Sequence, residues 1–292
     1  MVILQMKFDD RCFDCLLSRV SLECRLCGAG EEKTREVRET CAALLEELRD
    51  APLLHPQIAS AMHRQAYALL GSSDPFAALK EESTQEALAV CRMVRGDLSG
   101  FADFVLASII GNTYDYGVKG HTVTGDFLSY FRQEFDAGLA IDDTGRISEL
   151  LSRVVYFTDN CGEIVFDRLL LEELCRQGSS ITLAVRDAPI LNDATLEEAR
   201  ALRLDRFVRT ITTTGCGCEL GVRLDCMPDE LSAAIDDCTL IIAKGMANYE
   251  SLSEYSGLPP VAFLMAVKCE PIAEEVGVPR GSKVAMLRVG DR

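Results

Sequence analysis

The most informative stretch for chemistry spans residues 153–167, where an apolar and aromatic run stops at two polar side chains. Residues 154–158 are β-branched or aromatic, and Asp159 and Asn160 follow them directly, before a glycine and a helix-like pattern. This order predicts a strand, a tight turn and a helix. Ligands of open α/β sheets bind beyond the carboxyl ends of the strands, so we expect Asp159 and Asn160 to bind a divalent metal.

A second polar turn follows the next predicted strand, within the segment AVRDAPILNDATL at residues 184–196. Asn192 and Asp193 lie in this turn, and Thr195 stands near the expected N-terminus of the next helix. If the two strands are neighbours, Asp193 can approach Asp159. Their oxygen ligands suit Mg²⁺, Mn²⁺ or a similar ion better than zinc. The alternative for each aspartate is a helix cap, the role that most aspartates play at such turns.

A third candidate is AKGMANYESLSEY at residues 243–255, again directly after a predicted strand. A lysine and a glycine before a helix N-terminus provide a positive charge and free backbone N–H groups, which suit a phosphate. We therefore assign Lys244, Gly245 and Asn248 to substrate or phosphate binding. The alternative is that Lys244 covers the sheet edge while Asn248 caps the helix, since the stretch lacks the G-x-x-x-x-G-K motif.

Two other motifs have structural and functional interpretations. In GNTYDYG, at residues 111–117, Asn112 and Asp115 follow an apolar helix, and an Asx-type turn accounts for them without any function. Near the N-terminus, two C-x-x-C pairs can hold zinc tetrahedrally, act as redox pairs or pack as small apolar side chains. These four cysteines are Cys12, Cys15, Cys24 and Cys27.

Composition and charge exclude several classes of protein. The 292 residues carry 46 acidic and 30 basic side chains, a net charge of −16, which disfavours nucleic acids and anionic membranes as partners. No apolar run approaches the ~20 residues that span a bilayer, and the N-terminus does not resemble a signal peptide. We expect a cytoplasmic protein whose 13 cysteines are thiols rather than a disulfide framework. Its oligomeric state is left open.

The elements that must position these residues divide the chain in two. Residues 1–145 show helical periodicity nearly throughout, with helices expected at 34–48, 58–70, 84–94, 101–110 and 125–137. In residues 146–292, apolar strands alternate with helices, as in a parallel sheet covered on both faces. The strands are expected at 154–158, 181–185, 207–212, 239–243, 261–266 and 283–288. The prediction is a Rossmann-like, doubly wound, mostly parallel α/β/α sandwich with an N-terminal all-helical domain.

In this order, DNCGEIVFD, VRDAPILNDAT and KGMANYESLSE, behind a C-x-x-C and GNTYDYG, resemble the damage-control phosphatase family. That family is also called protein of unknown function 89 and acidic-residue-methyltransferase-like. The resemblance covers most of the chain and is closest to the stand-alone prokaryotic or archaeal branch. It implies a metal-dependent phosphatase that hydrolyses phosphorylated small metabolites, sugar phosphates among them, on a Rossmann-like domain behind a helical one.

The resemblance also assigns roles to residues. It implies metal ligation by Asp159, Asn160 and Asp193, with Asp159 or Asp193 orienting the attacking water. It implies that Lys244 contacts the phosphate and that Asn112 and Asp115 lie near the pocket. The expected cofactor is one divalent ion: Mg²⁺, Mn²⁺, Co²⁺ or Ni²⁺.

Two alternatives remain at this point. The first is an S-adenosylmethionine-dependent carboxyl methyltransferase, suggested by the family's other name, although the acidic turn after the first strand suits a metal better than a nucleotide. The second is a non-enzymatic thiolate-metal or redox protein built on the four N-terminal cysteines.

Overall fold

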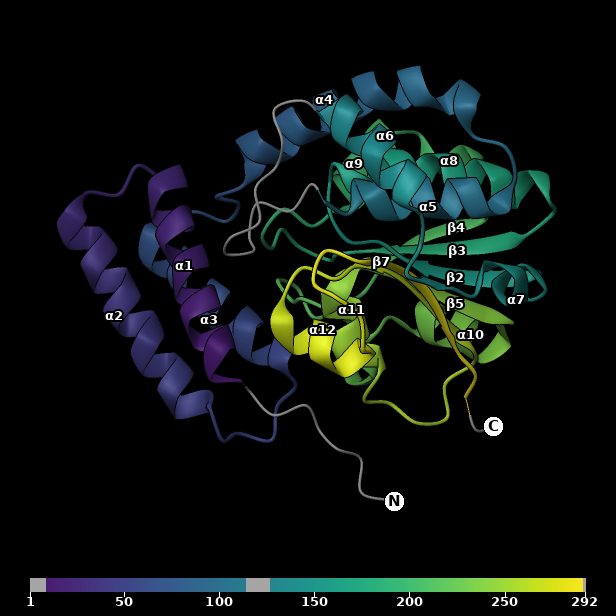
Figure 1. Ribbon diagram of the computed structural model, residues 1–292. Helices are drawn as coiled ribbons and strands as arrows, with labels where there is room; N and C mark the ends of the chain where they lie inside the picture. The colour runs from purple at the N-terminus through teal and green to yellow at the C-terminus, as the bar shows by residue number, and fades with distance from the viewer. Residues whose placement is uncertain (1–8, 114–126, 291–292) are drawn as a thin grey trace.

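The centre of the fold is a seven-stranded sheet, shown in Figure 1, in a computed structural model that describes residues 9–113 and 127–290. The strand order is β1–β7–β6–β5–β2–β3–β4, and all neighbours are parallel except β6 and β7. The strands are β1 (Ile141–Asp142), β2 (Arg153–Phe157), β3 (Ser180–Val185), β4 (Thr210–Thr213), β5 (Leu240–Lys244), β6 (Val261–Ala266) and β7 (Lys283–Arg288). The mostly parallel α/β fold predicted from the alternating pattern is confirmed.

Helices cover both faces of this sheet and form a lobe beside it. Among the described residues they are α1 (Asp10–Leu26), α2 (Glu31–Leu48), α3 (His55–Leu70), α4 (Ala77–Val94), α5 (Phe101–Gly111), α6 (Phe127–Ala137), α7 (Thr144–Ser148), α8 (Glu163–Arg176), α9 (Leu196–Ala201), α10 (Asp229–Asp237), α11 (Gly245–Leu252) and α12 (Glu270–Val276). Three short 3₁₀ turns complete the elements: Arg95–Asp97, Leu204–Arg206 and Leu224–Cys226.

The layers follow from which side chains each strand buries. In Figure 1, α4, α5, α6, α8 and α9 lie above the sheet, and α10, α11 and α12 lie below it. Strand residues alternate between the two faces: Leu240 and Ile242 of β5 belong to the upper core, and Ile241 and Ala243 belong to the lower one. Both faces are covered, which explains why the strands read as continuous apolar runs.

The strands that follow β2 in sequence are placed on both sides of it in the sheet. From β2 it adds β3 and then β4 on one side, and it then returns to place β5 on the other side of β2. This arrangement creates a topological switch point between β2 and β5, the usual place for a ligand in an open α/β sheet. The turns after β2, β3, β5 and β6 all meet at this carboxyl edge, because these strands are parallel.

Most predicted elements are present with small shifts at their ends. The strands expected at 261–266 and 283–288 have the same bounds in the structure. The strand expected from residue 207 begins at Thr210, because Phe207 still caps the 3₁₀ turn before it. The helix expected from Asn248 begins at Gly245, since the extended Lys244 already serves as its N-cap.

The packing departs from the division predicted at residue 145. Helices α1, α2 and α3 form the separate lobe seen at the left of Figure 1, with a core of their own. Helices α4, α5 and α6 instead share the upper core of the sheet, where α5 packs along α8. The described helices before residue 145 therefore belong to two bodies, and the packing changes between α3 and α4. Helical periodicity reports a buried face, but it does not report which partner buries it.

One cysteine pair also departs from the expectation of thiols throughout. Cys216 and Cys226 form a disulfide with Cα atoms 5.6 Å apart, across the loop between β4 and α10. The other eleven cysteines are free. Across the described ranges, no helix is long and apolar enough to cross a membrane.

Candidate functional site

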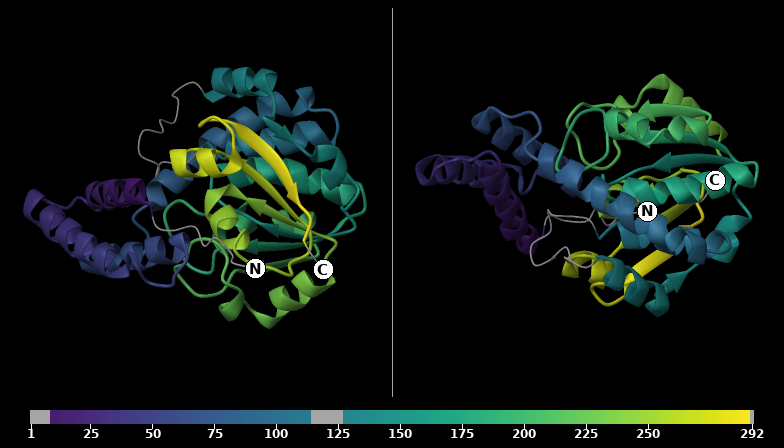
Figure 2. Two further views of the ribbon diagram at one scale, coloured as in Figure 1. Left: turned by 60° about the horizontal axis from the view of Figure 1, so that its bottom comes forward. Right: turned by 90° about the horizontal axis from the view of Figure 1, so that it is seen from above.

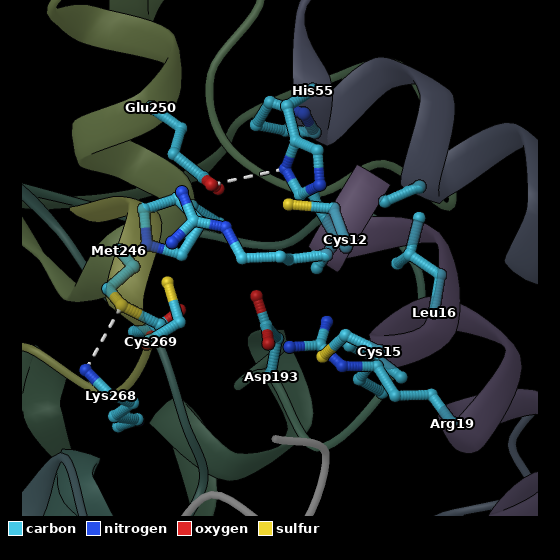
Figure 3. Close-up of a pocket in the computed structure, with 18 of the residues that line it drawn as sticks. Cys12, Cys15, Leu16, Arg19, His55, Asp193, Met246, Glu250, Lys268 and Cys269 are labelled. Atoms are coloured by element: carbon cyan, nitrogen blue, oxygen red, sulfur yellow. Dashed lines mark hydrogen bonds and ion pairs between the residues drawn. The ribbon is translucent and has the colours of Figure 1, made fainter. Parts of the chain in front are cut away.

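A pocket of about 210 Å³ opens at the carboxyl edge of the sheet, beneath the helical lobe. Its floor is formed by Asp159 and Asn160 after β2 and by Asn192 and Asp193 after β3. Its walls come from α1, the start of α3, α11 and the segment between β6 and α12. Figure 3 shows the Asp193 carboxylate pointing toward the middle of this space. The structure therefore brings together the two polar turns predicted from sequence.

Backbone hydrogen bonds hold these two turns side by side. The N–H of Ala194 donates to the carbonyl of Asp159 at 2.8 Å, and the N–H of Cys161 donates to the carbonyl of Asn192 at 2.9 Å. Asn160 and Asp193 form an isolated antiparallel bridge. The side chains of Asp159, Asn160 and Asp193 consequently share one small region that is almost closed to solvent.

The Asp159 carboxylate occupies a cradle made by two distant segments. Its Oδ2 accepts a hydrogen bond of 2.9 Å from Nδ2 of Asn112, at the end of α5. On the other side is Gly245, where a Cβ would lie only 1.9 Å from the same oxygen. Gly245 also has a φ of 73°, which L side chains rarely adopt. A glycine at this position is therefore what allows β5 to approach Asp159 so closely.

The Asp193 carboxylate is oriented by Arg186, a fully buried arginine just after β3. Nε of Arg186 donates to Oδ2 of Asp193 at 2.6 Å, and its terminal nitrogens donate to the Gly221 carbonyl and to Oδ1 of Asn248. The same guanidinium lies 3.8 Å from Oδ1 of Asp159. Arg186 thus offsets the charge of both carboxylates, which could not otherwise be buried as anions so close together.

Asn160 supplies the observation that tests whether a metal fits this floor. Its Nδ2 lies 3.5 Å from Oδ1 of Asp193, while its Oδ1 is buried and has no hydrogen-bond partner in the described part of the chain. Buried polar atoms are rarely left in this state without a ligand. Two carboxylates and an amide oxygen form a hard donor set of the kind that Mg²⁺ or Mn²⁺ accepts. Over the described residues, no three His, Cys, Asp or Glu side chains gather as a candidate metal cage, so a metal at this floor would need a donor of another type, such as this amide oxygen.

Lys244 does not reach this pocket, which corrects its assignment as the phosphate contact. It shares the strand face of Leu240 and Ile242 and therefore points into the layer between β5 and α8. There its Nζ donates to Oε1 of Glu163 at 2.5 Å and to Oδ1 of Asp167 at 2.7 Å, with all three side chains fully buried. Burial lowers the pKa of Lys244, but the two carboxylates outweigh it and raise the pKa. Burial raises the pKa of both acids against the opposing effect of Lys244.

Three other residues that the sequence assigned to substrate binding lie outside the pocket and support its floor. Asn248 donates from Nδ2 to the carbonyls of Thr158 and Lys244, and its Oδ1 accepts from Arg186. Asn112 joins Asp159 to Glu163. None of Asn112, Gly245 and Asn248 lines the pocket, so the structure assigns them to positioning rather than to direct phosphate contact. Asp115 lies outside the described residues.

Lys268 is the cation that sequence reasoning missed. It lies two residues beyond β6, lines the pocket and is only 5% exposed. Arg19 of α1 and Arg280 also line the pocket, and Figure 3 shows Lys268 and Arg19 on opposite sides of Asp193. The rule that selected Lys244, a lysine at the carboxyl end of a strand, applies equally to Lys268 and would have found it.

A histidine–glutamate pair closes the outer part of the pocket. Nδ1 of His55, at the start of α3, lies 3.1 Å from Oε1 of Glu250 on α11. Burial lowers the pKa of His55, but the charge of Glu250 and contact with Cys12 outweigh it and raise the pKa to about 10. Near neutral pH His55 is therefore protonated and joins the lobe to the α/β body as a cation.

The four N-terminal cysteines do not form one site. Cys12 and Cys15 lie near the start of α1 and line the pocket, whereas Cys24 and Cys27 lie at the other end of the same helix. With about 1.5 Å of rise per residue, Cys12 and Cys24 are about 18 Å apart along the axis. This distance excludes a single tetrahedral ion held by all four thiolates, so the four-cysteine site is wrong.

Comparison with known proteins agrees with this arrangement. Residues 8–284 match the domain described as the damage-control phosphatase ARMT1-like domain. A protein of Archaeoglobus fulgidus named damage-control phosphatase is 41% identical, over 97% of this chain and 99% of its own length. The chain belongs to the damage-control phosphatase family. A second family member of that name, from Pyrococcus horikoshii, is 30% identical over 96% of this chain and 98% of its own.

The damage-control phosphatase fold extends over the helical lobe as well as the sheet. A crystal structure from Pyrococcus horikoshii, described as a member of the family of unknown function 89, covers 96% of this chain and 98% of its own, with a TM-score of 0.86 and 29% identity. The views in Figure 2 show how the lobe of α1, α2 and α3 projects from the sheet. Here the lobe contributes α1 and the start of α3 to the pocket, so it is part of the candidate site.

Proposed function

We propose that this chain is a metal-dependent phosphomonoesterase that releases phosphate from small phosphorylated metabolites, with sugar phosphates as the first candidates. The observation that carries the proposal is the convergence of Asp159, Asn160 and Asp193 on one floor, with the amide oxygen of Asn160 buried and unpaired. The names of the relatives support phosphate release as the reaction. The small volume of the pocket suits a metabolite rather than a macromolecule.

Asp159, Asn160 and Asp193 would hold Mg²⁺, Mn²⁺, Co²⁺ or Ni²⁺. A divalent cation there supplies positive charge that offsets the phosphate dianion and so reduces its repulsion of a nucleophile. Hydrogen bonds from Arg186 and Asn112 hold the two carboxylates in place before substrate arrives. This preorganisation matters because the carboxylates then need no rearrangement during the reaction.

Lys268 takes the role first assigned to Lys244. Lys268 is one of the residues that line the pocket. The oxygens of a phosphate bound above the floor can accept hydrogen bonds from its N–H groups. Arg19 and Arg280 add positive charge from α1 and from the segment before β7. The lobe covers the site from the other side, and reduced access of water strengthens each of these charge interactions.

A phosphate-release screen tests the proposal directly. We expect the purified chain to hydrolyse members of a panel of phosphorylated metabolites when Mg²⁺, Mn²⁺, Co²⁺ or Ni²⁺ is present, and to lose this activity with a chelator. Asp159→Ala should reduce the rate by at least about 100-fold, because the carboxylate is a ligand. Asp205→Ala, at an exposed position on another face, is the matched control.

Two outcomes would refute the assignment. Full activity in Asp159→Ala would remove this carboxylate from the site, and activity that persists in chelator would remove the metal. Calorimetric titration with S-adenosylmethionine addresses the methyltransferase alternative. We expect no heat of binding, and saturable binding of that ligand would favour the alternative.

A further inference from the structure

We propose that Tyr67, on α3 of the helical lobe, is a positioning residue for the turn that carries Asn192 and Asp193. This inference rests on the proposed function, in which Asp193 is a metal ligand. Tyr67 is not among the residues that line the pocket. It acts through the backbone of Leu191, to which its hydroxyl is hydrogen-bonded.

The backbone of Leu191 has an unusual conformation. Its φ is 47°, and over the described residues only Leu191, Arg203 and Cys216 have a positive φ without being glycine. The N–H of Asp193 donates to the carbonyl of Ile190 at 3.1 Å, so residues 190–193 form a tight turn with Leu191 at its second position. A positive φ there is normally met by Gly, Asn or Asp, and a branched leucine adopts it only when its surroundings impose it.

The hydroxyl of Tyr67 is part of those surroundings. The N–H of Leu191 donates to Oη of Tyr67 at 2.9 Å, across 124 residues of sequence. Both residues are buried in the core of the lobe, Leu191 at 5% exposed and Tyr67 at 6%. Without the hydroxyl, this buried N–H loses its partner, and the turn loses the contact that favours its strained form.

A second hydroxyl on α3 acts on the same carboxylate by another route. Oγ of Ser60 accepts the N–H of Leu220 at 2.8 Å, and the next carbonyl, that of Gly221, accepts a hydrogen bond from Arg186. Arg186 in turn orients Asp193. Seven residues separate Ser60 from Tyr67, which places them on the same face of the helix, two turns apart. Helix α3 is thus linked to Asp193 by two indirect routes, one through the Leu191 backbone and one through Arg186.

The inference predicts that the lobe sets the metal affinity of the site. Tyr67→Phe removes one oxygen and leaves the packing of the ring intact. We expect it to weaken Mn²⁺ binding by about tenfold, which is within the range seen when a group that orients a metal ligand is lost. The matched control is Tyr249→Phe: Tyr249 is also 6% exposed, and its hydroxyl makes one hydrogen bond, to Glu275, away from this turn.

The experiment uses the whole chain and two readouts. Mn²⁺ affinity is measured by calorimetric titration, and hydrogen exchange is measured for the backbone amides of Leu191 and Asp193. Tyr67→Phe should weaken affinity and speed exchange at these two amides by tenfold or more, whereas Tyr249→Phe should change neither. A purely structural role for Tyr67 would lower the melting temperature of Tyr67→Phe and leave its Mn²⁺ affinity unchanged.

Failure of this inference can be told apart from failure of the proposed function. If the wild-type chain binds no Mn²⁺, the metal proposal fails, and hydrogen exchange alone decides whether Tyr67 holds the turn. If Mn²⁺ binds and Tyr67→Phe changes neither affinity nor exchange, the positioning role is overturned. If Tyr67→Phe does not fold, Ser60→Ala replaces it, with weakened Mn²⁺ binding expected and unchanged binding overturning the inference.

Discussion

Replacement of Gly245 by alanine should remove metal binding while the fold survives. The new Cβ would lie 1.9 Å from Oδ2 and 2.3 Å from Cγ of Asp159. Non-bonded carbon and oxygen atoms prefer separations of roughly 3.5 Å, so the carboxylate must retreat by about 1.5 Å. Ligand distances to Mg²⁺ are about 2.0–2.1 Å and tolerate little change. One of the three proposed protein ligands is therefore lost.

Gly245→Ala should have two separate effects, one on the stability of the fold and one on metal affinity. The positive φ of 73° costs alanine about 1–2 kcal/mol of backbone strain, which lowers the stability of the fold. The displaced carboxylate should weaken Mn²⁺ or Mg²⁺ binding by at least about 100-fold, or about 2.7 kcal/mol. Only the second part depends on Asp159.

Gly257→Ala separates these two parts. Gly257 has a φ of 77°, and a Cβ there would meet nothing within 4 Å. Thermal unfolding should show a similar loss of stability in Gly257→Ala and Gly245→Ala. Calorimetric titration with Mn²⁺ and a phosphate-release assay should show a defect only in Gly245→Ala. Metal affinity and turnover in Gly245→Ala within threefold of the values in Gly257→Ala would refute the argument that Asp159 is a ligand held by this close approach.

Four further predictions concern charges and thiols. Lys244→Ala should destabilise the fold by about 3–5 kcal/mol, measured by urea unfolding, because two buried carboxylates lose their partner. Lys268→Ala should lower kcat/KM by at least about tenfold, and unchanged kinetics would remove Lys268 from phosphate binding. The pKa of His55 is raised from 6.5 to about 10, so its stabilising contribution is complete below pH 6.5 and is lost as pH rises toward 10. The melting temperature should therefore fall less between pH 7 and 10 in His55→Gln than in the wild type, and equal falls would contradict the pair. Titration of unfolded protein should count eleven thiols without reductant and thirteen after reduction, whereas thirteen in both would exclude the bond between Cys216 and Cys226.

Local patterns were sufficient to predict that Asp159, Asn160 and Asp193 meet at one pocket, whereas metal binding there stays a prediction. Asp159 and Asn160 lie in the turn after β2, Asp193 lies in the longer connection after β3, and the carboxyl ends of parallel neighbours meet at one edge. Short stretches of sequence indicate both that a segment is a strand and that it belongs to a parallel sheet. The proximity of the two turns then needed only that β2 and β3 be neighbours, as they are.

The same rule did not distinguish Lys244 from Lys268. Both follow apolar strand residues, but a strand sends alternate side chains to opposite faces, and the sequence does not say which face meets the crevice. In the fold, the face of Ile242 and Lys244 meets α8, where Glu163 and Asp167 neutralise the lysine. Lys268 lies two residues beyond the end of β6 and lines the pocket.

The sequence by itself determined the strands and helices of the α/β body, the parallel character of the sheet and the two acidic turns, because each depends on residues near one another in the chain. Only the tertiary structure decided which distant groups surround the carboxylates of the two acidic turns. Asn112, Arg186 and Gly245 surround the carboxylates, and α3 reaches the turn at Leu191 from 124 residues away. Such contacts arise where separate elements pack together, and no local pattern encodes the distances between them.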